Sequence, residues 1–444
     1  MNNRNQMENQ DFLMTANVPA FPEYDTNDRI FAALYFLVGY GFIYVFTGVT
    51  EFGPLSVFTV FYAAVVLLYL KVKHKTPPKE SWFWLAVMLA IGIPLGFWTV
   101  LYLFQILALM AVAAYWTLAA SGRLLENRTS QWIFFDGWNA LAVVPFKNFL
   151  CQIRVLFGNV TGKEAEGTGK KNGIAILLGI LLAVPALFII LPLLSSADAG
   201  FEQLVGELVR YIQSHLLQTF IRNIFSIPVS FYLFGLMFGG ISGRNTDCIQ
   251  KEKLRAAGQS IRRIPDTAVC TALGILCFVY ILFIGIQGNY LFSAFTGHIP
   301  QSFTYAEYAR RGFFELCKIG LWNLILLGCA GLFSRSRVGE HRGLSIFTFL
   351  LSVLTLILII TAMSKMGMYI SVYGLTVNRI LPMVFMLWMM LVFGSIILRL
   401  KKAFPMVRIC IMAGAVLFCL LCVLPVEKWT QMYNFWARAR GLIM

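Results

Sequence analysis

The chain of 444 residues is 59% apolar and only 13% charged. Soluble globular proteins are about 45–50% apolar and about 25% charged. This composition excludes a soluble enzyme, a DNA-binding domain and a disulfide-stapled secreted module. Long continuous apolar stretches also exclude an outer-membrane β-barrel, whose strands alternate in segments of about ten residues. The predicted fold class is therefore an all-α, polytopic transmembrane helical bundle.

Eleven apolar stretches approach the roughly 20 residues that a helix needs to cross a bilayer. The predicted spans are 30–49, 54–71, 82–98, 100–120, 173–193, 224–242, 267–286, 313–333, 344–363, 381–398 and 406–424. The third and fourth spans belong to one apolar run from Trp82 to Ala120, in which Gly92-Ile-Pro-Leu-Gly96 offers a break. Without a turn at this break the count would be ten.

The basic residues indicate an orientation. If the N-terminus is inside, the predicted inner segments carry 26 of the 36 lysines and arginines. Basic residues collect in cytoplasmic loops, where they meet anionic lipid headgroups. The net charge of +15 is thus assigned to membrane orientation and not to a nucleic-acid partner. The prediction is a multi-pass protein of the bacterial cytoplasmic membrane, with its N-terminus inside and its C-terminus outside.

The loops between the spans suggest a domain organisation. The expected parts are a polar cytoplasmic tail (1–29), a four-span bundle (30–120), a basic cytoplasmic interfacial loop and linker (121–172), a seven-span bundle (173–424) and a short outer tail (425–444). Within the basic loop, Trp132–Phe157 is rich in aromatic residues and is interpreted as an interfacial helix or a re-entrant segment, followed by a Gly- and Lys-rich linker. In 201–222, apolar residues recur at helical spacing, which predicts an amphipathic helix along the outer surface.

Several residue types are missing from the predicted spans. None of these spans contains a histidine or an aspartate, which argues against an aspartyl intramembrane protease and an Asp-based proton relay. The sequence has no H-E-x-x-H motif for zinc. Gly167-Thr-Gly-Lys170 does not have the spacing of a phosphate-binding P-loop. We therefore expect no metal and no cofactor.

The most informative stretch leads into the eighth span, from Tyr305 to Lys318. As a helix it places four charges of alternating sign on one face, because neighbouring members are three or four residues apart; they are Glu307, Arg311, Glu315 and Lys318. Arg379, in the next outer loop, is expected near the same membrane face. The group is either an ion-pair ladder that anchors the helix or a site for a ligand, an ion or a partner.

Glycines recur at the end of the sixth span. Gly235, Gly239 and Gly243 form two overlapping G-x-x-x-G spacings. Small residues at this spacing let two helices approach closely, so we predict a helix-packing contact there.

Two of these stretches also carry a family resemblance. Tyr305-Ala-Glu-Tyr-Ala-Arg-Arg-Gly-Phe-Phe-Glu-Leu316, together with Tyr373-Gly-Leu-Thr376 and Arg379, resembles the signatures of a bacterial multi-pass membrane family known only as a domain of unknown function (the 4153/4173 group). The similarity extends from about the first span to Tyr433-Asn434. After its last span the family usually has an acidic, Asn-containing segment, which Gln431–Arg438 resembles weakly. The resemblance implies a bacterial inner-membrane protein and brings no established reaction.

Three functions remain open at this point. The leading hypothesis is a non-enzymatic membrane protein for transport or ligand sensing, which could work with membrane or cytoplasmic protein partners through the basic segments 121–172 and 243–266. The second is a membrane-embedded enzyme for a lipid-linked substrate, with Glu315 as the only carboxylate suited to act as a general base. The third is a scaffold subunit of a membrane complex. In a Glu315→Gln variant an enzyme should lose turnover while still folding, whereas a scaffold should lose only stability or assembly.

Overall fold

The computed structural model describes residues 21–47, 53–92, 102–158, 190, 217–296 and 305–441. These residues form helices, joined by turns and short connections, and no β-strand. In this part of the chain nine helices are long and apolar enough to cross a membrane. The predicted all-α, multi-pass architecture is confirmed, while the count of eleven spans stays a prediction. The predicted span 173–193 and the linker 158–172 lie almost wholly outside the described residues.

The chain divides into two compact units that do not follow chain order. The first unit comprises Met1–Pro54, Ala64–Thr76 and Ala142–Thr246, and the second comprises Leu55–Ala63, Pro77–Leu141 and Asp247–Met444. Helices far apart in the chain pack together within each unit, and the consecutive parts expected from the sequence stay a prediction.

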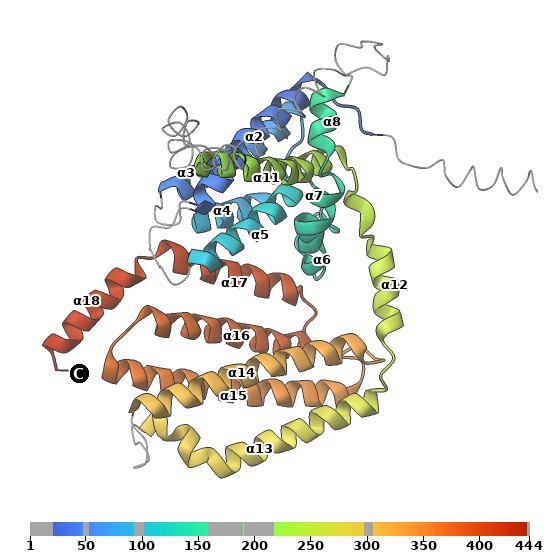
Figure 1. The fold of residues 1–444 in the computed structure, drawn as a ribbon. Helices are drawn as coiled ribbons and strands as arrows, with labels where there is room; N and C mark the ends of the chain where they lie inside the picture. The colour runs from blue at the N-terminus through green and yellow to red at the C-terminus, as the bar shows by residue number, and fades with distance from the viewer. Residues whose placement is uncertain are drawn as a thin grey trace, which may run out of the picture. The chain divides into compact units, whose positions relative to one another are not determined.

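In the first unit, α2 (Thr26–Thr47) packs against α11 (Leu217–Ser242), as Figure 1 shows. The contact is aromatic, and the Tyr35 and Phe234 rings meet edge to face with centroids 5.6 Å apart. The second half of α3 (Gly53–Val72) also belongs to this unit. The short helices α7 (Val144–Lys147) and α8 (Cys151–Phe157) pack on α11. Of the amphipathic helix predicted over 201–222, only 217–222 is described, and it forms the start of α11.

The second unit begins with α4 (Ser81–Gly92) and α5 (Tyr102–Ala120), which pack together. The Gln105 side chain donates a hydrogen bond to the Ile91 carbonyl over 2.6 Å. This contact requires the chain to turn back between the two helices, so the break predicted near Gly92 is confirmed. At α4 the described helix is only 12 residues long.

The aromatic segment after α5 is a broken helix. It contains α6 (Ile133–Trp138), a π-helical turn η2 (Asn139–Val143), α7 and α8. Ile133–Lys147 and Cys151–Phe157 together are apolar enough for a membrane segment and are bent by 44°. Large side chains on this segment, such as Phe134 and Trp138, are exposed. A bent apolar helix of this kind is either a broken span or a re-entrant segment.

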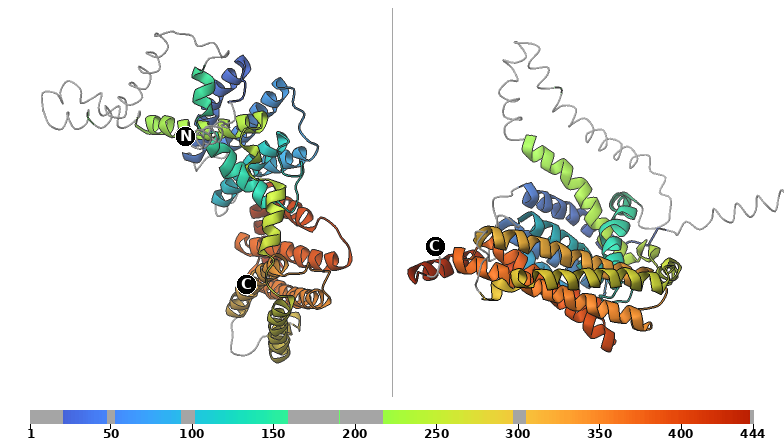
Figure 2. Two further views of the ribbon diagram at one scale, coloured as in Figure 1. Left: turned by 90° about the vertical axis from the view of Figure 1, so that its right-hand side faces the viewer. Right: turned by 90° about the horizontal axis from the view of Figure 1, so that it is seen from below.

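Most of the second unit is a row of long helices. These are α13 (Asp266–Thr296), α14 (Tyr305–Phe333), α15 (Arg342–Tyr373), α16 (Val377–Lys401) and α17 (Met406–Val423), followed by α18 (Val426–Ala439). Figures 1 and 2 show α13 to α17 lying side by side, with α15 in contact with α13, α14 and α16. Because each helix reverses direction, α13, α15 and α17 end where α14, α16 and α18 begin. We call this the motif end of the bundle, since it carries Tyr305, Tyr373 and Arg379.

Two helix boundaries differ from the predicted ones in ways that matter below. α15 continues to Tyr373, ten residues beyond the predicted end of the ninth span, so Lys365 lies inside a helix and not in a loop. α2 begins at Thr26 and the span in α13 at Asp266, so the expectation that no span contains an aspartate is wrong for Asp28 and Asp266. Both lie in the first helical turn, where a carboxylate is favoured by the helix dipole.

Candidate functional site

The predicted helix over residues 305–318 is confirmed as the first part of α14. Glu315 and Lys318 are exposed on this helix, and Glu307 and Arg311 lie on its preceding turns. Glu315 is ten residues from the helix start, which corresponds to ~15 Å along the helix axis at 1.5 Å per residue. Glu315 and Lys318 lie in the first two turns of the candidate span Phe313–Phe333, and a carboxylate and an ammonium are uncommon within such a span.

Lys365 was not among the site residues predicted from the sequence. It lies on α15, only 1% exposed, at ~12 Å from the helix end by the same helical rise. α14 packs along α15 in the opposite direction, so the start of α14 lies beside the end of α15 (Figure 1). Glu315 and Lys365 are therefore at the same level of the bundle. We define Glu315, Lys318 and Lys365 as the charged layer.

A chain of neutral hydrogen bonds lies deeper in the same helices. The Tyr280 hydroxyl donates to Asn323 Oδ1 over 2.8 Å, and Asn323 Nδ2 donates to Thr355 Oγ1 over 2.9 Å. Asn323 is fully buried. These bonds connect α13, α14 and α15, and they satisfy polar groups that would otherwise be costly to bury. They fix the three helices that carry the charged layer or pack beside it.

Arg379 has a local role at the motif end. Its guanidinium donates to the Tyr373 carbonyl over 3.0 Å and to the Gly374 carbonyl, and it lies 4.1 Å from the centre of the Tyr369 ring. It therefore caps the end of α15, where unpaired carbonyls attract a cation. Among the described side chains, no ion pair joins Arg379 to Glu315.

Asn434 of α18 holds the loop between α15 and α16. Its Oδ1 accepts from the Leu375 N–H over 2.7 Å and its Nδ2 donates to the Leu375 carbonyl over 2.8 Å. Next to Leu375, Gly374 has φ +78°, a conformation that favours glycine. The stretch 373–376, Arg379 and Asn434 thus form one structural assembly, although about sixty residues separate its ends in the chain.

The predicted packing glycines lie in the first unit. A Cβ on Gly235 would come within 2.9 Å of the Pro145 and Asn148 carbonyl oxygens, and one on Gly239 within 2.4 Å of Asn148 Nδ2. The contact is made with α7 and the residues that follow it. Gly243 lies directly after α11 with φ +73°, as a helix-terminating glycine.

Other ion pairs hold helices to each other. In the first unit the buried Asp28 accepts hydrogen bonds from the Tyr69 hydroxyl over 2.6 Å and from the Lys73 ammonium over 2.7 Å. Burial raises the pKa of the neighbouring Asp25, but the hydrogen bond from the Asp28 N–H and the Lys73 charge outweigh it, so this pKa lies below its usual value. In the second unit Arg408 pairs with Glu80 over 2.7 Å. Every carboxylate in these pairs has its partner on another helix or loop, which indicates a structural role.

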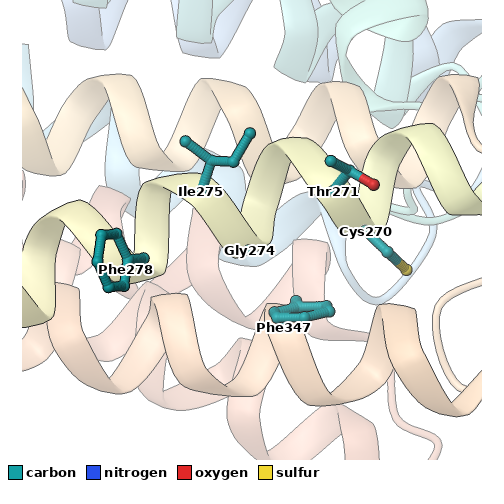
Figure 3. A pocket seen from close by; sticks show the side chains of 6 residues that line it. All are labelled: Cys270, Thr271, Gly274, Ile275, Phe278 and Phe347. Atoms are coloured by element: carbon teal, nitrogen blue, oxygen red, sulfur yellow. The ribbon is translucent and has the colours of Figure 1, made fainter.

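One groove lies between α13 and α15. It has a volume of about 400 Å³ and is lined by Cys270, Thr271, Gly274, Ile275, Phe278 and Phe347. Figure 3 shows the Phe347 ring beside Gly274, and a Cβ on this glycine would come within 3.1 Å of the ring. The lining is almost entirely apolar and lies on membrane-spanning helices, so the groove suits hydrocarbon and not a polar solute. In the part of the chain that the structure describes, no three His, Cys, Asp or Glu side chains gather as metal ligands.

Comparison with known proteins gives one family. The model of the family described as "Domain of unknown function (DUF4153)" matches residues 79–442, more than four fifths of the chain. The match begins just before α4, so the similarity starts later than the first span, where the resemblance was expected to begin. No curated protein and no solved structure matches the chain. The matched region contains the whole motif end, with the charged layer and the Arg379–Asn434 assembly, and the chain belongs to the DUF4153 family of proteins with a domain of unknown function.

Proposed function

We propose that this protein binds a small anionic solute at the charged layer, as a non-enzymatic transporter or ligand sensor of the bacterial cytoplasmic membrane. The observation that carries the proposal is Lys365, an ammonium group only 1% exposed within a membrane-spanning helix. Ionisable groups at such positions are costly, and they commonly face a substrate path, a cavity or a charged partner.

The balance of charges favours an anion. Around the motif end of α14 and α15, three cations, Arg311, Lys318 and Lys365, stand against the two carboxylates of Glu307 and Glu315. Arg379 adds a fourth cation, already used to cap α15. An anionic solute would compensate this excess of positive charge.

The end of the bundle opposite the motif end supports a second part of the proposal, a contact of basic residues with lipid or protein. α12 (Lys251–Ile261) carries no buried residue, and its Lys251 pairs with Glu126 over 2.7 Å. The hydrogen bond from Lys251 lowers the pKa of Glu126. The other two basic side chains of α12, Lys253 and Arg255, are exposed. We assign them to anionic lipid headgroups or a cytoplasmic partner protein.

The experiment measures aqueous access to position 315. In a chain without its native cysteines, Glu315→Cys is treated in intact cells with a membrane-impermeant maleimide, with and without small anions such as phosphate or succinate. The matched control is Trp322→Cys, two turns further along α14 on the same face and exposed beside the apolar Leu321 and Ile325. We expect labelling at 315, slowed by an anion, and none at 322.

The alternatives give different results. If position 315 reacts only after denaturation, Glu315 and Lys365 are a packed pair, and a scaffold subunit is the better description. If Glu315→Gln leaves the protein folded and able to bind the anion but abolishes turnover of a lipid-linked substrate, Glu315 acts as a base and the protein is an enzyme. If a neutral solute slowed labelling at position 315 and no anion did, the result would contradict the proposal that the ligand is an anion.

A further inference from the structure

The last helix, α18, has three distinct faces. One face packs on the bundle through Val426, Thr430 and Ala437, which are buried at helical spacing. Asn434 lies on the same face and makes its two hydrogen bonds to Leu375. This side of α18 is therefore fixed to the loop between α15 and α16.

A second face is apolar and exposed. Trp429, Met432, Tyr433 and Trp436 follow the spacing i, i+3, i+4, i+7 and so form one stripe, the aromatic face. The stripe is next to the packed face, not within it, and no described residue buries it. On the third face Gln431 and Arg438 are polar and exposed, and Phe435 is the one large apolar side chain exposed beside them.

The position of α18 identifies what covers the aromatic face. Only Leu424 and Pro425 separate α18 from α17, a membrane-spanning helix, so α18 starts at the depth where that span ends. Figures 1 and 2 show α18 leaving the end of α17 without running back along the other helices. Tryptophan and tyrosine are enriched at this depth, where an apolar ring body and a polar tip suit the boundary between hydrocarbon and water.

One cation completes the pattern. Arg440 directly follows α18, and its guanidinium is 4.2 Å from the centre of the Trp436 ring. Arginine beside an interfacial tryptophan can reach lipid phosphates while its stem rests on apolar surface. A solvated aromatic stripe of this size would be unfavourable in water.

We infer that α18 is an interfacial helix, with its aromatic face in the bilayer leaflet at the motif end and with Arg440 at the lipid phosphates. Its packed face simultaneously holds residues 373–376 through Asn434. The lipid surface thereby becomes a binding partner of the motif end, and the depth of α18 sets the position of the loop between α15 and α16.

The experiment measures the depth of two neighbouring positions. The full-length chain, without its native cysteines, is reconstituted in phosphatidylcholine–phosphatidylglycerol vesicles with a nitroxide at Met432→Cys or at Gln431→Cys. Collisions with oxygen, which concentrates in lipid, and with a water-soluble nickel chelate are compared. We expect the label at 432 to favour oxygen and the label at 431 to favour nickel, because the two side chains lie on different faces of one helical turn.

Two results would overturn the inference. If both labels collide mainly with nickel, α18 extends into water. If the label at 432 is protected from both reagents, a protein surface or a second copy of the chain covers the aromatic face. The effect of the two Asn434–Leu375 hydrogen bonds is tested separately by a nitroxide label at Thr376→Cys. This label should become more mobile when Asn434→Ala is added, and unchanged mobility would contradict the role of Asn434 in holding the loop.

Discussion

Asp136 is fully buried in the first helix of the broken segment. Its Oδ1 accepts a hydrogen bond from the Leu125 N–H over 2.9 Å, and within the described residues its Oδ2 has no hydrogen-bond partner. A buried carboxylate with one unsatisfied oxygen is costly in its charged form. The residue lies just before the π-helical turn, a feature often found at functional sites.

Two substitutions of Asp136 distinguish the stabilisation by its hydrogen-bond acceptor from the free-energy cost of its buried negative charge. Asp136→Asn keeps an oxygen for Leu125 and removes the charge, so we expect an unchanged or higher thermal unfolding midpoint in detergent. Asp136→Ala leaves the Leu125 N–H without an acceptor, which costs about 1–3 kcal/mol. If Asp136→Asn destabilised the protein as much as Asp136→Ala, the negative charge itself would be required, and a cation would have to bind there.

Residues of the site could be predicted when their role depends on local spacing. The run of charges ending at Lys318 is visible as a helical pattern, and the helix is confirmed. Lys365 could not be found in this way, because hydropathy averaged over a window ends the span near a charge, while packing of α15 against three helices extends it to Tyr373. The hydrogen-bond partner of Asn434 could not be predicted either, because only the fold brings Leu375 close to it.

At the level of helices, α11 and α7 depend on close approach at glycine. A methyl group on Gly235 would lie 2.9 Å from two backbone carbonyl oxygens. Backbone atoms cannot move aside as a flexible side chain can, so Gly235→Ala should lower the free energy of unfolding by about 1–3 kcal/mol. Thermal unfolding in detergent measures the loss.

The matched control is Gly394→Ala on α16. A Cβ there would have no neighbour within 4 Å, so the variant should gain up to about 1 kcal/mol from the better helix propensity of alanine. Equal effects of the two variants would contradict a close contact between α11 and the α7 region. The sequence pattern indicated close packing at Gly235, but not its partner, because small residues show where a helix can be approached and not by which element.

For the whole molecule, membrane orientation can be tested without the residues outside the described ranges. Five helices, α13 to α17, lie between the exposed Cys248 and the exposed Lys428. If all five cross the bilayer, these two positions must be on opposite sides, whatever the total number of spans. The segment 243–266 carries six of the basic residues, which favours the cytoplasmic side for Cys248.

The measurement uses a chain whose only cysteine is either Cys248 or the one introduced by Lys428→Cys, with the cysteine-free chain as the blank. In intact cells an impermeant maleimide should label position 428, and it should label Cys248 only after permeabilisation. Labelling of both positions from outside would mean that one helix does not cross, and α17, with 18 residues, or ~27 Å, would be the first to examine. The reverse pattern would keep all five crossings but would show that the basic residues do not set the orientation. The charged layer and α18 would then face the cytoplasm, and the solute of the proposed site would be an intracellular one.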